Sequence, residues 1–502
     1  MPSASLPYAL FLATYLLILL AVGAWKARGI RSQSDFSLAG RGLSTGVLVG
    51  TLLATWIGTG SLFGNAGEAF GVGVDAFLLP LGSLLGLIPL WYLAPRLRRF
   101  GKFTLQDVLE ARFGPLTRVL GSLTLVAAYV IIVSNQYRAG ATVLGYLWPD
   151  LPDAAALWAV ALFVIAYTAL AGMVSVAYTD VANGLLMLLG LGLALPVMWE
   201  LSGGLGGALD ALPPENARLF GHYGWTELIG VTLPPFLLLV GDANMVQRFF
   251  SATTPEAARR SVLWMMLGVL VLEFAILLFA VLASGAVAAG SLSAPEIEGH
   301  ILVHAAFEAL SPWLGALLVA TAMAVVVSTA DSYLLSPSTS LVRDLWQRFL
   351  RPQADERELV RAGRVVVVFA GLGALVLAFT SESFFRVALF SYTIYGAGLT
   401  PALLAAYFWP RANAAGAVAS VVSGVGVALL WREITSDDFL AGSGGGFLRS
   451  LGELGTEWGL DPVMPAVLVS VLVLVVVSLM TPPPSPERAR VFQDLGQGAE
   501  NT

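Results

Sequence analysis

The chain has 502 residues, of which 57% are hydrophobic and only 12% are charged, whereas soluble domains are roughly 25% charged. This composition excludes an ordinary soluble enzyme, and the net charge of −6 argues against a nucleic-acid-binding protein. Cysteine is absent, which excludes disulfides, thiol catalysis and cysteine-based metal sites. Apolar blocks of about 20 residues, the length that crosses a bilayer as a helix, instead predict an all-α polytopic membrane protein.

The hydrophobic blocks predict about thirteen transmembrane helices within one membrane domain, residues 1–480. In chain order we expect them at 7–25, 43–69, 74–94, 119–147, 155–171, 176–199, 226–247, 262–289, 309–336, 364–380, 384–408, 412–431 and 463–480. A proline run follows the last block and starts a short tail, residues 481–502.

The positions of arginine and lysine predict an N-terminus outside and a C-terminus inside. Arg138 falls within a span, and nearly all the other basic residues, Arg248 among them, fall in loops or span ends predicted to be cytoplasmic. The loops predicted to lie outside contain only Arg218, Arg386, Arg432 and Arg449. We expect a multi-pass protein of the inner or plasma membrane, in contact with lipid. The excess of arginine over lysine is typical of a GC-rich bacterium, and no pattern indicates an oligomeric state.

Two predicted spans contain residues that interrupt a helix. Residues 54–67 read A-T-W-I-G-T-G-S-L-F-G-N-A-G, and Pro234 and Pro235 precede V-G-D-A-N-M-V-Q-R at 240–248. Non-helical backbone at membrane depth is tolerated where it is buried in protein or lines a cavity, so these breaks indicate binding sites. The broken spans are five apart, as in an inverted repeat of five plus five helices, here about 43–199 and 226–408. Alternatively, the glycines only permit close helix packing.

Four acidic residues lie inside predicted spans, where an unpaired carboxylate is costly. They are Asp180, Asp242, Glu273 and Asp331. No role is predicted for Glu273. Asp180 and Asp331 are expected at similar depths, on the cytoplasmic side of their spans.

The ninth span is rich in oxygen-bearing side chains. Ser328, Asp331 and Ser332 stand at i, i+3 and i+4 and therefore face one side of a helix. Hard cations such as Na⁺ bind several oxygens, and a broken helix would add free carbonyls. The alternative is that these hydroxyls bond to their own helix and that Asp331 lines a hydrated crevice.

These motifs together resemble the sodium:solute symporter family over nearly the whole chain. The resemblance rests on A-T-W-I-G-T-G at 54–60, G-M-V-S-V-A-Y-T-D-V at 172–181, V-Q-R at 246–248, M-A-V-V-V-S-T-A-D-S at 323–332 and R-D-L-W at 343–346. It implies a leucine-transporter-like fold of five plus five helices flanked by extra helices, here 7–25, 412–431 and 463–480. It also implies Na⁺-coupled symport of a small organic solute by alternating access, with Na⁺ as coupling ion and no other cofactor.

Carried over to this sequence, the resemblance implies two cation sites. The principal Na⁺ site would use the carbonyls of Ala54, Ile57 and Val325 and the hydroxyls of Ser328 and Thr329. A second site would use Asp180, Asp331 and Ser332 together with Ser328. The same two carboxylates could instead carry a proton, which gives a proton-coupled transporter of the same fold as the alternative function.

The solute is expected beside the first break. The candidate binding residues are Trp56, Gly58, Gly60, Tyr137, Arg138 and Asp242. The motifs are most similar to the choline transporter branch, and Trp56 could face a quaternary ammonium group. A buried Arg138 would instead favour a carboxylate, unless Arg138 and Asp242 form a structural ion pair. An embedded enzyme is disfavoured because no catalytic dyad or metal set is visible, and a sensor module because the tail carries no signalling domain.

Overall fold

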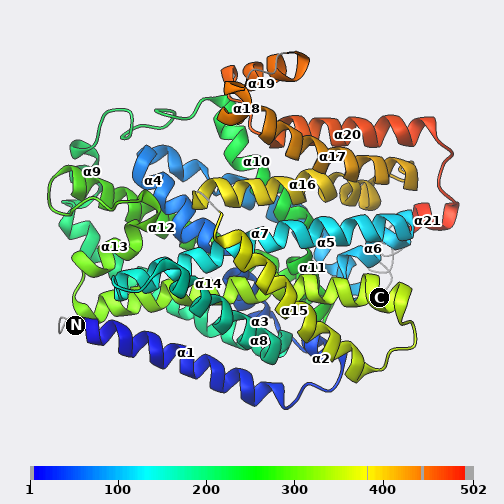
Figure 1. Cartoon of the computed structure of the whole chain (residues 1–502), viewed down its shortest axis with the longest axis horizontal. Helices are drawn as coiled ribbons and strands as arrows, with labels where there is room; N and C mark the ends of the chain where they lie inside the picture. The colour runs from blue at the N-terminus through cyan, green and yellow to red at the C-terminus, as the bar shows by residue number, and fades with distance from the viewer. Residues whose placement is uncertain (1–4, 381–382, 443–445, 492–502) are drawn as a thin grey trace.

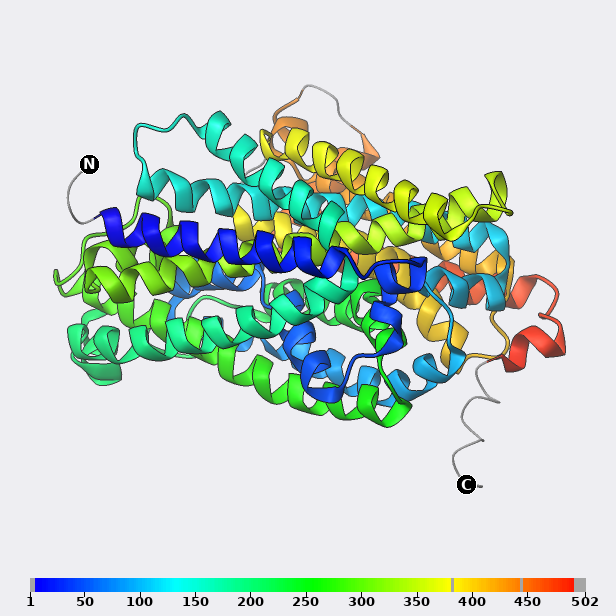
Figure 2. The same ribbon diagram turned by 90° about the horizontal axis from the view of Figure 1, so that it is seen from below.

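A computed structural model describes residues 5–380, 383–442 and 446–491. The long helices run roughly side by side along the longest axis (Figures 1 and 2). They are α1 (Ser5–Ala27), α3 (Thr45–Trp56), α5 (Leu81–Phe100), α7 (Pro115–Leu147), α8 (Asp153–Leu201), α10 (Trp225–Gly241), α12 (Pro255–Ala288), α14 (Pro312–Ser340), α15 (Glu356–Ala378), α16 (Phe384–Phe408), α17 (Ala414–Ile434) and α20 (Val463–Met480).

Shorter helices connect the long ones or complete broken spans. They are α2 (Gln33–Leu38), η1 (Ala39–Arg41), η2 (Gly60–Asn65), α4 (Ala66–Val72), η3 (Gly73–Leu78), α6 (Leu105–Phe113), α9 (Gly204–Ala211), α11 (Ala243–Ser251), η4 (Glu298–His300), α13 (Ile301–Glu308), η5 (Leu341–Leu350), α18 (Asp437–Ala441), α19 (Phe447–Glu457) and α21 (Pro486–Arg490). The helices α9 and α13 lie at one end of the bundle, and α2, α6 and α21 lie at the other (Figure 1).

Ten helices of the described chain are long and apolar enough to cross a membrane, or eleven if α3 and the segment from η2 to η3 form one bent span. The helix α8 has 49 residues, about twice the length that crosses a bilayer. It changes direction at Gly172, whose φ of 58° is unfavourable for other residues and where a Cβ would lie 2.9 Å from the ring of Phe36. This break separates the two spans expected at 155–171 and 176–199. The total of thirteen, the orientation, the repeat boundaries and the tail, of which residues 492–502 lie outside the described ranges, stay predictions.

Most expected span boundaries agree with the helices to within a few residues, but α12 begins at Pro255 rather than 262 and α15 at Glu356 rather than 364. The third span differs as well. That helix, α5, begins at Leu81 rather than near residue 74, because residues 73–78 form the 3₁₀ segment η3 that continues the broken span.

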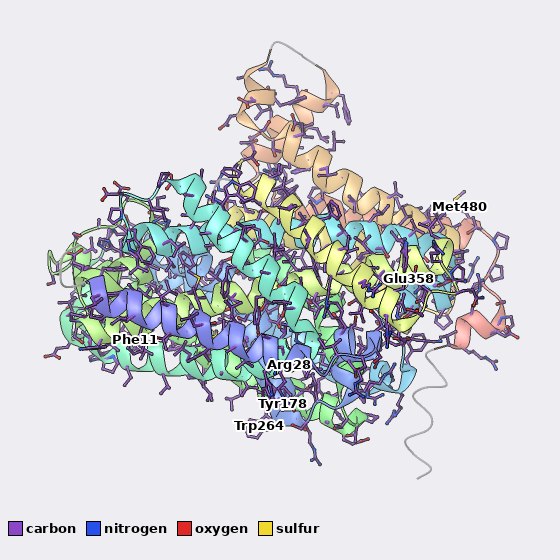
Figure 3. All side chains as sticks on the ribbon, turned by 60° about the horizontal axis from the view of Figure 1, so that its bottom comes forward. Phe11, Arg28, Tyr178, Trp264, Glu358 and Met480 are labelled. Carbon is purple, nitrogen blue, oxygen red and sulfur yellow. The ribbon has the colours of Figure 1, made fainter. Side chains whose placement is uncertain are left out.

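The helix α14 occupies the centre of the bundle, where α1, α7, α8 and α15 pack around it. Most of its residues, polar ones included, are buried. Helices α1 and α20 lie on opposite edges in Figure 1. Apolar side chains such as Phe11 and Trp264 point outward from the bundle (Figure 3). A polar centre inside an apolar surface suits a protein whose site lies within the bilayer.

Candidate functional site

The first broken span changes direction by 51° between α3 and η2. The helix α3 ends at Trp56, and its C-cap residue Ile57 has extended φ and ψ angles of −74° and 92°. Gln136 of α7 compensates for the break, because its Oε1 accepts from the Thr59 backbone N–H at 3.3 Å and its Nε2 donates to Thr59 Oγ1 at 2.8 Å. Glycines at 58 and 60 explain the break, since glycine costs about 1 kcal/mol in a helix relative to alanine.

Two hydroxyls of α14 face the end of α3. Ser328 Oγ and Thr329 Oγ1 both donate to the Ala54 carbonyl, at 3.2 and 3.3 Å, and Ser328 also reaches the Val325 carbonyl at 3.2 Å. These distances are long for O–H···O bonds, which are usually about 2.7–2.8 Å. Hydroxyls and carbonyls thus converge without strong bonds among themselves, an arrangement that can bind a hard cation. The structure therefore brings Ala54, Val325, Ser328 and Thr329 together.

The remaining predicted ligand of this group, Ile57, is buried at the C-cap of α3, three residues beyond Ala54. Gly58 follows it and permits the close approach of α14. A Cβ at Gly58 would lie only 3.1 Å from Thr329 Oγ1.

A second polar cluster links α3, α8, α11 and α14. Asp180 Oδ2 accepts from Thr51 Oγ1 at 2.5 Å and lies 3.5 Å from Arg248 Nη2. Arg248 also donates to Thr51 Oγ1 at 2.9 Å and to Ser332 Oγ at 2.6 Å. Asp180 and Arg248 are fully buried.

Arg248, expected at a cytoplasmic span end, lies in the last turn of α11 and is fully buried. Its guanidinium is held inside the bundle by a carboxylate and two hydroxyls. The V-Q-R motif contained the signal, but a rule that counts every arginine near a span end as a loop residue cannot separate a buried arginine from an exposed one.

Asp331 lies on the other side of this cluster. Its Oδ1 accepts from Thr168 Oγ1 at 2.6 Å, and Asp180 is close enough to repel it electrostatically. The Oδ1 atom of Asp180 is buried without a hydrogen-bond donor. Ser332, in contrast, already contacts Arg248 and Thr55. Of the expected set, Asp180 and Ser332 both contact Arg248, whereas Asp331 is hydrogen-bonded to Thr168.

The second broken span bends at Asp242, between α10 and α11. Asp242 is the N-cap of α11, because its Oδ1 accepts from the Asn244 N–H at 2.6 Å. Tyr129 and Tyr333 also donate to this carboxylate, at 2.6 and 3.3 Å. Asp242 thus has protein partners of its own in the two tyrosines and in the N-terminus of α11.

Arg138 lies toward the α13 end of α7. Its guanidinium is 4.9 Å from the centre of the Phe384 ring. Burial, Arg138 and His304 together lower the pKa of His300 to about 4, so His300 is neutral near pH 7. Tyr137 points toward α15, where a Cβ at Gly371 would lie 3.2 Å from its hydroxyl.

A small cavity of about 40 Å³ lies next to the first break, enclosed by η2, α5, α10, α12 and α16. This volume accommodates only a few water molecules, since one requires about 10–15 Å³. Of the predicted solute ligands, Trp56 and Gly60 line this cavity, whereas Gly58, Tyr137, Arg138 and Asp242 do not. Sequence reasoning missed Glu273 and Tyr392, which also line it. The only sequence signal was that Glu273 is an acid inside a span.

The chain matches the Sodium:solute symporter family over residues 36–424. It is 27% identical over 455 residues to the high-affinity proline transporter PutP of Bacillus subtilis. This alignment covers 86% of this chain and 94% of that protein. It is also 27% identical to the sodium/proline symporter of Haemophilus influenzae, with 95% of each chain covered.

Solved structures share the fold. A Na⁺-coupled sialic acid symporter superimposes with a TM-score of 0.76 at 18% identity, covering 95% of this chain and 98% of that one. The nucleobase-cation symporter Mhp1 superimposes with a TM-score of 0.57 at 13% identity, covering 92% and 99%. These likenesses confirm the predicted fold class.

Proposed function

The chain belongs to the sodium:solute symporter family, and from this premise we propose that it carries a small amino-acid-like solute, such as L-proline, together with Na⁺ bound between the first broken span and α14. Na⁺-coupled symport of a small solute across the plasma membrane is the activity of the protein, as the matched family and the relatives named sodium/proline symporters establish. The proton-coupled alternative is not favoured by these relatives.

The convergence of the Ser328 and Thr329 hydroxyls on the Ala54 carbonyl supports the proposed principal Na⁺ site. Na⁺ at this position would contact α3 and α14 at once, and would therefore favour the arrangement in which the two helices are close. Ion binding can drive solute movement only through such a difference in affinity between two states of the protein. The membrane potential adds about 2.3 kcal/mol per charge for each 100 mV.

A second cation is proposed between Asp180 and Asp331. Arg248 compensates one of the two buried carboxylates, which leaves one negative charge, and Asp180 Oδ1 has no donor. One Na⁺ would balance this charge. If Asp331→Ser leaves the ratio of Na⁺ to solute in transport unchanged, this second site is refuted.

The principal site can be tested without knowing the solute. We expect the melting temperature of purified protein to rise in NaCl relative to KCl at equal ionic strength, since a ligand at 100 times its Kd stabilises by about 2.7 kcal/mol. Ser328→Ala should remove this rise, whereas Ser336→Ala, eight residues further along α14, should keep it. An equal rise in both variants would refute the site. Uptake of labelled L-proline into proteoliposomes under a Na⁺ gradient then tests the solute.

A further inference from the structure

Glu273 is a buried carboxylate that the ion sites do not use. It lies in the middle of α12 with 2% of its surface exposed. Its two oxygens accept from Ser61 Oγ at 2.5 Å and from Asn65 Nδ2 at 3.0 Å, both on η2 of the first broken span. Within the described ranges no arginine, lysine or histidine forms an ion pair with it. Neutral donors alone compensate poorly for a charge at membrane depth.

This carboxylate lines the cavity next to two aromatic rings. Trp56 and Tyr392 are stacked with their ring centres 6.4 Å apart, and both belong to the same cavity wall. A Cβ at Gly60 would lie 2.8 Å from the Tyr392 hydroxyl, so glycine keeps this corner open. Leu389 and Pro235 supply apolar surface.

A carboxylate beside aromatic faces is suited to an organic cation. The carboxylate balances the positive charge, and the negative faces of the rings attract it. A bare Na⁺ is less suited, because it binds several oxygens at once and the Ser61 and Asn65 groups already donate to the carboxylate.

We propose that Glu273 binds the ammonium group of the transported solute, and that Trp56 and Tyr392 contact the carbon atoms next to that group. This inference rests on the proposed symport function and narrows the solute to molecules with a cationic nitrogen, including zwitterionic amino acids. Since the cavity in this structure holds only a few waters, solute binding requires the cavity to widen.

The test uses pairs of probes of similar shape whose nitrogen position is charged in one and neutral in the other. L-proline is compared with L-pyroglutamate, whose ring nitrogen is a neutral lactam, and choline with 3,3-dimethylbutan-1-ol. Affinity is measured on the purified full chain in saturating NaCl, from the ligand dependence of the melting temperature. We expect at least one cationic probe to bind roughly tenfold or more tightly than its neutral partner, since only the cationic probe places a positive charge beside the carboxylate.

Glu273→Gln keeps the shape of the side chain and should abolish this preference. Glu68→Gln is the matched control, because Glu68 is a carboxylate of α4 on the first broken span that accepts from Tyr223 and does not line the cavity. The control should retain the preference. Stabilisation by Na⁺ alone is measured in the same samples, so that failure of the ion site and failure of the ammonium site are distinguished.

Three results would overturn the inference. The first is that no cationic probe is preferred by the wild-type protein, and the second is that Glu273→Gln retains the preference. The third is that Glu273→Gln changes the Na⁺ concentration for half-maximal stabilisation and not the preference for cations, which would make Glu273 an ion ligand.

Discussion

The backbone groups at the two helix breaks differ in how they are hydrogen-bonded. At the second break, the Tyr395 hydroxyl donates to the Gly241 carbonyl at 2.8 Å and accepts from the Ala243 N–H at 3.2 Å, while Asp242 caps α11. At the first break, the Ala54 carbonyl receives only two long hydroxyl contacts from α14. Strong hydrogen bonds from side chains satisfy the backbone groups at the second break, which therefore has a structural role. At the first break, the Ala54 carbonyl can still bind a ligand.

The comparison separates two kinds of mutational effect. Changes to Asp242 or Tyr395 at the second break should reduce stability and leave the Na⁺ dependence unchanged, because the bonds there are made in the absence of any ligand. Changes at the first break should alter the Na⁺ dependence and leave the stability in KCl nearly unchanged.

The largest effect is expected at Arg248, which extends from the second broken span to Thr51 of the first. Arg248→Gln leaves Asp180 buried without its cation, and breaking a buried pair in this way costs about 3–5 kcal/mol. Thermal unfolding in KCl measures this loss. The double variant Arg248→Gln/Asp180→Asn should recover part of the loss, and an additive loss would contradict the pairing.

Tyr395→Phe should produce the next largest effect. It removes the hydroxyl that joins Gly241 to Ala243 and leaves both backbone groups buried, at a cost of about 1–3 kcal/mol. The melting temperature should fall equally in NaCl and KCl. A selective fall in NaCl would mean that the second break also binds Na⁺.

Thr329→Val should raise the Na⁺ concentration for half-maximal stabilisation roughly tenfold, equivalent to about 1.4 kcal/mol. Valine keeps the shape of threonine and removes only the oxygen that contacts Ala54. The melting temperature in KCl should stay near that of the wild type. Thr321→Val, on the same helix but bonded to Leu186 and Leu317, serves as the control.

A separate, pH-dependent effect is expected at Asp461, which packs against Gly230 of the second broken span and lies outside the spanning helix α20. Burial raises its pKa from 3.8 to about 6. Because the folded state binds this proton more tightly, the contribution to stability is complete below about pH 4 and is lost as the pH rises through 6. Melting temperatures between pH 4 and 7 should therefore fall more in the wild type than in Asp461→Asn. Equal pH profiles would contradict the raised pKa.

Sequence reasoning predicted the features that lie along one helix. The glycines at 58 and 60 indicated the first break, and the spacing of Ser328, Asp331 and Ser332 indicated one polar face on α14. These patterns are local, so helical periodicity is sufficient to read them.

The cavity wall could not be predicted in this way. Ser61, Glu273 and Tyr392 come from three helices that are far apart in sequence, and only tertiary packing brings them together. Asp242 was expected to bind solute because it is an acid in a broken span. The structure shows that Asp242 is the N-cap of α11, the helix that begins after the break.

A short backbone bridge links the chain on either side of the two breaks. The Leu43 N–H donates to the Ser251 carbonyl, and the Thr253 N–H donates to the Leu43 carbonyl, each at 3.0 Å. Leu43, just before α3, is thereby hydrogen-bonded to Ser251 and Thr253 at the end of α11. A tilt of α3 would therefore also displace α11, so the two interrupted spans would move together.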